Sequence, residues 1–99
     1  MNRNQFVFDG EIISADTLRH TPAGIPALTL TLRHESHQEE AGKDAATQFE
    51  ISALAFGMVA MELAEVHPGE MVMVKGFMNR KNRFSDAPVL HITEFKTLN

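Results

Sequence analysis

The sequence predicts an all-β protein: a five-stranded barrel with one short helix between its third and fourth strands. Two patterns lead to this prediction. Most of the chain alternates apolar and polar residues with the period of two that is typical of half-buried strands, and one segment spaces its apolar residues three or four apart, as a helix does. The length of 99 residues suits a single domain spanning residues 1–99.

The first strand is expected over residues 5–14, where β-branched and aromatic residues surround Gly10. A glycine inside a strand often marks a bulge or a sharp bend, so this strand should curve at Gly10. Residues 19–26 hold two prolines and a glycine, which predicts a turn.

The second strand follows the turn, because Leu28, Leu30 and Leu32 alternate with polar residues whose face would be open to a ligand. Residues 34–46 show no apolar periodicity and contain three glutamates, so we expect a solvated connection there. The alternation resumes over residues 49–53, which predicts the third strand.

A short helix is expected over residues 56–66, where apolar residues fall three or four apart until His67-Pro68-Gly69 ends the pattern. Residues 70–79 are apolar on both faces and predict a fourth strand that is buried on one side and covered on the other. Residues 80–87 form a basic loop, and residues 89–98 complete the chain as the fifth strand.

This order of elements is the pattern of the OB-fold, a partly open Greek-key barrel of five strands. A small α+β sandwich has the same order of elements. The bend expected at Gly10 favours the barrel, because closure needs one strand that serves both halves of the sheet.

The composition limits the classes of function. Thirteen acidic residues against nine basic ones give a net charge of −4, which argues against a uniformly basic nucleic-acid coat, so any DNA contact must be local. There is no cysteine for a disulfide or a thiolate zinc site. The start of the chain lacks the apolar stretch of a signal peptide and no run suits a membrane span, so we expect a cytoplasmic protein.

No motif for catalysis or cofactor binding is present, so we expect neither an enzyme nor a bound cofactor. His34 and His37 stand three apart, but no third ligand is near them and no helix is expected to bring the two rings together. A metal site is therefore not expected.

Several segments of the chain resemble bacterial single-stranded DNA-binding proteins. Residues 18–26, LRHTPAGIP, are similar to the first hairpin of that family. Ala55-Phe56-Gly57 leads through the predicted helix to Pro68-Gly69-Glu70 and then to Val74-Lys75-Gly76, as in the same proteins. Residues 34–42, HESHQEEAG, further resemble the primosomal replication protein N (PriB) family.

The resemblance implies a homodimeric OB-fold protein that binds single-stranded DNA without sequence preference. It would serve in replication restart with the primosomal helicase and other primosome proteins, and would have no catalytic activity. The chain ends directly after its last expected strand, without the acidic-tipped tail of single-stranded DNA-binding proteins, which also favours the PriB family. Two alternatives stay open: a tail-less protein that coats single-stranded DNA, and an OB-fold adaptor between proteins with weak or no DNA binding.

The basic loop is the first candidate for DNA contact. Binding of single strands needs cations that follow the phosphates and flat groups on which bases stack. The resemblance implies DNA contacts at Arg80, Lys81 and Arg83, and Phe84 stands beside them as a candidate for stacking.

A second set of candidate DNA contacts lies on the strand face and in the segments next to it. These residues are Arg19, Arg33, His34, Lys43 and Gln48. The family has aromatic residues at or near the positions of Lys43 and Gln48. Tryptophan and tyrosine are absent and most of the seven phenylalanines fall at expected core positions. We therefore expect little stacking and weak, salt-sensitive binding.

Apolar residues exceed what one small barrel can bury. Phe6, Val7 and Phe8 of the first strand, with Met71 and Met73 of the fourth, predict a dimer interface. On the helix, Met58 and Met61 are expected to fill gaps in the core. Glu35, Glu39 and Glu40 would repel phosphate and are expected to form a solvated turn or a surface that faces a partner protein.

Overall fold

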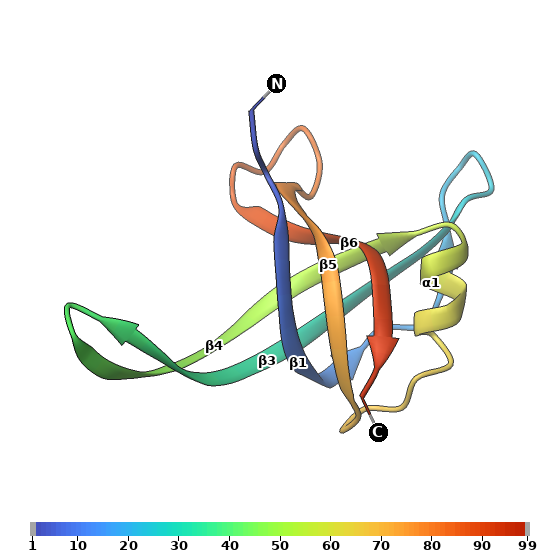
Figure 1. Ribbon diagram of the computed structural model, residues 1–99. Coiled ribbons are helices and arrows are strands. Elements are labelled where there is room, and N and C mark those ends of the chain that lie inside the picture. The colour runs from blue at the N-terminus through green and yellow to red at the C-terminus, as the bar shows by residue number, and fades with distance from the viewer. Residues whose placement is uncertain (1, 99) are drawn as a thin grey trace.

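The computed structural model describes residues 2–98, which form six strands and one helix (Figure 1). In chain order these are β1 (Phe6–Ala15), β2 (Arg19–His20), β3 (Pro26–Glu40), β4 (Lys43–Phe56), α1 (Met58–Leu63), β5 (Met71–Arg80) and β6 (Pro88–Thr97). Within this range no helix is long and apolar enough to cross a membrane.

The five long strands close into a barrel. They are hydrogen-bonded in the order β1-β5-β6-β4-β3, and β3 pairs again with β1. All of these pairings are antiparallel except that of β4 with β6, which is parallel. A closed barrel of five strands with one helix between its third and fourth members confirms the OB-fold prediction.

Strand β1 serves both halves of the barrel, as predicted. Its residues 6–11 pair with β5 and its residues 11–15 pair with β3, with a shift of register between Ile12 and Ser14. Gly10 lies where the pairing changes from one partner to the other, and a Cβ atom added there would stand 3.3 Å from the carbonyl oxygen of Arg33. The glycine thus permits β3 to approach β1 closely.

The core lies inside the barrel under α1. Every long strand and the helix contribute inward side chains to it, and the largest fully buried ones are Ile12, Leu28, Leu32, Leu63, Val72, Val74 and Leu90. Strands β5 and β6 approach each other closely at Gly76, where a Cβ atom would overlap the carbonyl oxygen of His91. This approach coincides with a shift of register between Lys75 and Gly76, and it fixes β6 against β5.

The predicted connection over residues 34–46 is wrong, because this segment is strand. β3 and β4 continue as a two-stranded hairpin, here called the arm (residues 33–50, from the Arg33–Glu50 pair outward), which projects away from the side that carries α1 (Figure 1). The turn consists of Ala41 and Gly42 alone, both at positive φ (54° and 75°), and Glu40 pairs with Lys43. The arm carries polar residues on both faces, so it lacks the apolar alternation that reveals a half-buried strand.

The helix is shorter than predicted and its orientation differs from the expectation. It spans Met58–Leu63 because Gly57, at a φ of 73°, lies outside the helical region. Ala60 and Leu63 face the core, so Met58 and Met61 point outward and are 69% and 49% exposed. The prediction that these methionines fill the core is therefore wrong.

Candidate nucleic-acid interface

The basic loop between β5 and β6 is open to solvent. Arg80, Lys81, Arg83 and Phe84 are all exposed, and none of the three cations forms an ion pair with another residue in the range 2–98. Phe84 is 84% exposed, and the guanidinium carbon of Arg83 lies 4.8 Å from the centroid of its ring. The loop thus presents unpaired positive charge beside an open ring.

This loop lies next to the polar strand face of the barrel. Lys81 lines a small hollow of about 100 Å³ together with Thr29 of β3, Ser52 and Leu54 of β4, and Val89 of β6. The loop is therefore not folded away from the strands, and its cations can act together with groups on the barrel surface.

Three rings from three strands lie side by side on the outer surface of the barrel. His91 of β6 stacks on Phe77 of β5 at 5.1 Å and 17°, and Phe56 of β4 lies 6.1 Å from His91 at 34°. Phe56 and Phe77 are 42% and 36% exposed. We call Phe56, His91 and Phe77 the ring row; it offers flat groups of the kind on which unpaired bases stack.

The backbone aligns the ring row with the basic loop. Phe77 is the direct partner of His91 in the β5–β6 register, and Leu54 is its partner in the β4–β6 register. The Nε2 atom of His91 lies 3.3 Å from the carbonyl oxygen of Arg80, where the basic loop begins. The loop and the ring row therefore form one continuous surface, which we call the barrel face.

Arg19 belongs to the barrel face by its position in the sheet. It is exposed, and it pairs with Ala27 of β3, which in turn pairs with Phe56 of β4. Side chains at directly opposed positions point to the same side of a sheet, so Arg19 lies on the side of Phe56.

Arg3 is a cation that the sequence did not suggest for this surface. The side chain of Asn4 makes two hydrogen bonds to the backbone of Met78, at 2.8 and 3.0 Å, and so holds the N-terminal segment along the end of β5. The exposed Arg3 lies next to this anchor, near the strand end that carries Arg80.

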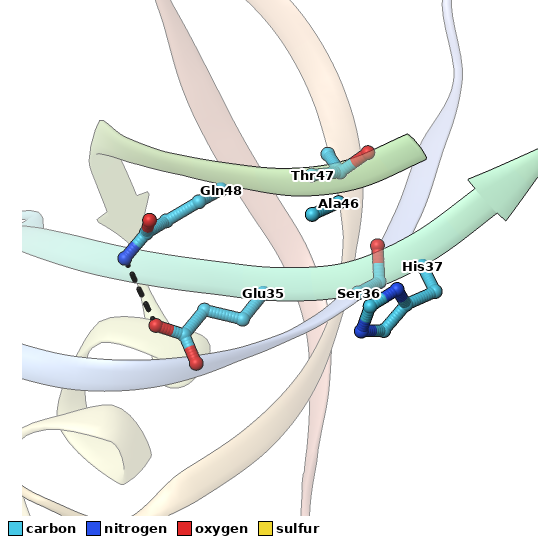
Figure 2. Close-up of a pocket in the computed structure, with 6 residues that line it drawn as sticks. All are labelled: Glu35, Ser36, His37, Ala46, Thr47 and Gln48. Atoms are coloured by element: carbon cyan, nitrogen blue, oxygen red, sulfur yellow. Dashed lines mark hydrogen bonds between the residues drawn. The ribbon is translucent and has the colours of Figure 1, made fainter. Parts of the chain in front are cut away.

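On the arm, the candidate contacts are already engaged with acidic groups. Arg33 pairs with Glu35 at 3.3 Å, and it lies opposite Glu11 on β1 and Glu50 on β4. The amide of Gln48 donates a hydrogen bond of 3.0 Å to Oε1 of Glu35 (Figure 2). Three acidic residues thus share the side of the sheet that carries Arg33, and one of them is ion-paired with it, which leaves Arg33 poorly placed to attract a phosphate.

His34 holds the arm against β1. Its Nδ1 lies 2.7 Å from the carbonyl oxygen of Asp9 and its Nε2 lies 2.7 Å from Oγ of Ser36. Its ring packs against Phe8 and Phe49, with centroids 5.5 and 5.0 Å away. Both nitrogens of His34 thus have hydrogen-bond partners, and its ring packs against two phenylalanines. His34 therefore has a structural role in the arm.

The tip of the arm is acidic. Lys43 lies opposite Glu40, Glu39 lies opposite Asp44, and Nδ1 of His37 is 2.9 Å from Oδ2 of Asp44. Nearer the barrel, a hollow of about 300 Å³ is lined by Glu35 and five uncharged or histidine side chains (Figure 2). The structure therefore separates the two sets of candidates, with unpaired cations on the barrel face and charges that are mostly compensated on the arm.

The expectation that most phenylalanines lie in the core is wrong. Five of the seven are exposed: Phe6, Phe49, Phe56, Phe77 and Phe84. A sequence signal for Phe77 was present, because Lys75 and Asn79 stand two residues to either side and a strand with that pattern points all three outward. His91 gave no comparable signal, since only the register of β6 brings it beside the two phenylalanines.

Known proteins with similar sequences belong to the single-strand binding and PriB families. Residues 4–94 match the family described as "another single-strand binding protein family". The chain is 35% identical over 98 residues to replication restart protein PriB of Nitrosomonas europaea, covering 99% of this chain and 91% of that protein. It is 42% identical over 85 residues to PriB of Neisseria gonorrhoeae, covering 86% and 84%.

Solved structures show the same fold. The PriB structure from Ralstonia solanacearum superposes with a TM-score of 0.90 at 28% identity, covering 99% of this chain and 100% of that one. The single-stranded DNA-binding protein of Thermus aquaticus gives a TM-score of 0.77 at 20% identity, covering 98% of this chain and 50% of that one. At that identity the second likeness shows the fold alone.

Proposed function

Because the chain belongs to a family of single-strand binding proteins and to the replication restart protein PriB family, we propose that it binds single-stranded DNA during replication restart. These are families of binding proteins and not of enzymes. We further propose that the chain acts in the cytoplasm as one domain, residues 1–99, and that the barrel face is its DNA-binding surface.

One observation carries the choice of surface: unpaired cations lie directly beside an exposed row of rings. A single strand alternates negative phosphates with flat bases, so a surface that holds cations beside rings can bind both without contacting base edges. Arg80, Lys81 and Arg83 supply the charge, and the ring row supplies the stacking surface. Recognition of this kind has no sequence preference.

The ring row also changes the expected strength of binding. Each stacked base contributes about 1 to 3 kcal/mol, and every base has a face that can stack. The absence of Trp and Tyr predicted that stacking would be small, but two exposed phenylalanines and a histidine restore part of it. Binding should therefore depend on rings as well as on salt.

Strand β1 supports the proposal of a homodimer. Its residues 6–8 pair with β5 on one side only, and Phe6 and Val7 are both exposed. An unpaired strand edge with apolar side chains suits pairing with the same strand of a second copy around a two-fold axis. A dimer would carry two basic loops and so strengthen DNA binding through multivalency. Sedimentation that finds only the 11.0 kDa species would contradict this.

The acidic arm is proposed to face the primosomal helicase and other primosome proteins. Its carboxylates repel DNA, and Glu39 and Glu40 lie at its exposed tip. Reversing both charges should weaken binding of the helicase and leave DNA binding unreduced. Unchanged affinity for the helicase would remove this part of the proposal.

The test of the function is the salt dependence of binding to oligothymidine. If three cations each neutralise one phosphate, the log–log slope for one protomer should be about −2, and alanine at residues 80, 81 and 83 should flatten it. Undetectable binding of the unchanged protein at low salt would favour an adaptor between proteins. Cooperative coating of long strands, without co-purification of the helicase, would favour a tail-less coating protein.

A further inference from the structure

The outward side of α1 and of the turn that follows it carries a distinct stripe of side chains. Met58, Met61, Glu62 and Glu65 follow the spacing i, i+3, i+4, i+7, which places them on one side, and all four are exposed. The opposite side buries Ala60 and Leu63 in the core. We call these four residues the α1 stripe.

Further apolar surface adjoins the start of the α1 stripe. The backbone N–H of Gly57 donates a hydrogen bond of 2.9 Å to the carbonyl oxygen of Pro26, so Ile25 and Met58 each lie one residue from this bond. Ile25 is exposed like the methionines. Exposed apolar residues are ordinarily scattered singly over a soluble protein, and a cluster of them marks a site of interaction.

The charges of the α1 stripe define what can cover it. Glu62 and Glu65 extend the line of methionines, and the segment from Gly57 to Val66 contains no lysine or arginine to offset them. Single-stranded DNA is excluded as the occupant, because its phosphates would meet these two carboxylates and no aromatic ring lies on the stripe.

A second copy of this chain is also disfavoured. A two-fold interface brings the same patch of both copies together, so it would gather four carboxylates, those of Glu62 and Glu65 from each protomer, in one interface. Like charges at an interface oppose association.

We propose that the α1 stripe docks a short amphipathic segment of a partner protein, whose apolar side chains cover Met58 and Met61 while its Lys or Arg side chains pair with Glu62 and Glu65. Methionine suits such a surface because its unbranched, polarizable side chain adapts to different apolar partners. This mode of docking resembles the seating of a basic amphipathic helix on a methionine-rich, acidic surface. It is independent of the proposed DNA binding, which uses the barrel face.

The test uses a synthetic helical peptide with leucines at i, i+3, i+4 and i+7 and lysines flanking them. Its control has the same leucines with glutamate in place of every lysine. The lysine peptide should bind and perturb the NMR amide signals of α1 and Ile25, whereas the glutamate peptide should not bind. Met58→Ser with Met61→Ser should weaken peptide binding about tenfold or more, as should Glu62→Lys with Glu65→Lys.

Two control measurements test whether a loss of peptide binding comes from unfolding, from a general change of charge or from damage to the DNA site. Glu39→Lys with Glu40→Lys changes the net charge equally on the arm and should leave peptide affinity unchanged. The Met58→Ser, Met61→Ser variant should keep its oligothymidine affinity, which shows that it is folded. The proposal is overturned if both peptides bind equally, if neither binds, if the peptide perturbs only the arm or the barrel face, or if the wild-type chain self-associates through α1.

Discussion

The barrel face and the arm both offered candidate DNA contacts, yet their charges are organised in opposite ways. On the barrel face, Arg80, Lys81 and Arg83 have no acidic partner within residues 2–98 and lie beside exposed rings. On the arm, Arg33 pairs with Glu35 and lies opposite two further glutamates.

The difference shows that whether a cation can attract a DNA phosphate depends on the charges next to it. A phosphate that approaches the basic loop meets three cations that form no ion pair within residues 2–98, and binding releases the counterions of the DNA. A phosphate that approaches Arg33 meets Glu11, Glu35 and Glu50 as well, so the carboxylates outnumber the cation and repulsion outweighs attraction. The net charge of −4 is thus compatible with a local DNA-binding surface.

Substitutions in the ring row should cause the largest loss of DNA affinity. Phe56→Ala or Phe77→Ala should each weaken oligothymidine binding by about 1 to 3 kcal/mol, or roughly five- to 150-fold, because each removes a surface on which a base can stack. Fluorescence anisotropy with a labelled oligothymidine measures this.

The matched control for the ring row is Phe49→Ala on the arm. Phe49 is also exposed, but it packs with His34 and Phe8, so its loss should lower thermal stability and leave DNA affinity unchanged. If Phe49→Ala weakens DNA binding as much as Phe77→Ala does, the arm and the barrel face are equivalent and the comparison fails.

Two double variants compare the cations of the basic loop with those of the arm, and each variant removes two positive charges. Arg80→Ala with Lys81→Ala removes two phosphate contacts, so the magnitude of the log–log salt slope should fall by about 1.4. Arg33→Ala with Lys43→Ala should leave the slope as it is, because Arg33 is already paired with Glu35, and Lys43 lies opposite Glu40 and next to Asp44, whose carboxylates repel a phosphate. Equal loss of slope in the two variants would show that DNA also follows the arm.

A smaller effect is expected when the acidic partner of Arg33 is neutralised. Glu35→Gln keeps the shape of the side chain but frees Arg33, and an exposed ion pair of this kind is worth at most about 1 kcal/mol. DNA affinity should therefore rise no more than about fivefold by the same anisotropy assay. Adding Arg33→Ala to Glu35→Gln should abolish the gain, and a gain that persists would assign the effect to general loss of negative charge.

Much of the fold could be predicted from the sequence because its signal is local. The alternation of Leu28, Leu30 and Leu32 with polar residues identified a half-buried strand, and Gly10 marked the place where β1 changes partner. The arm escaped prediction because neither of its faces is buried in a core, so residues 34–46 carry no apolar period to detect.

The site was harder to predict because its parts come together only through the sheet. The basic loop is continuous in sequence, and its exposure followed from composition. The ring row combines Phe56, Phe77 and His91 from three strands, and only the registers of β4, β5 and β6 make them neighbours. The roles of Arg33 and His34 likewise depend on cross-strand partners that the linear sequence does not show.

The turn of the arm offers a change that should alter the arm alone. Ala41 has a φ of 54°, which costs an L-residue about 1 kcal/mol or more, whereas asparagine adopts this conformation readily and is favoured with glycine in two-residue hairpin turns. Ala41→Asn should therefore stabilise the hairpin by about 1 kcal/mol and slow hydrogen exchange of the arm's amides. DNA affinity should stay the same, since the proposed binding surface lies on the barrel. A change in affinity caused by this single turn residue would mean that the arm's conformation takes part in DNA binding, and the division between the two regions would have to be abandoned.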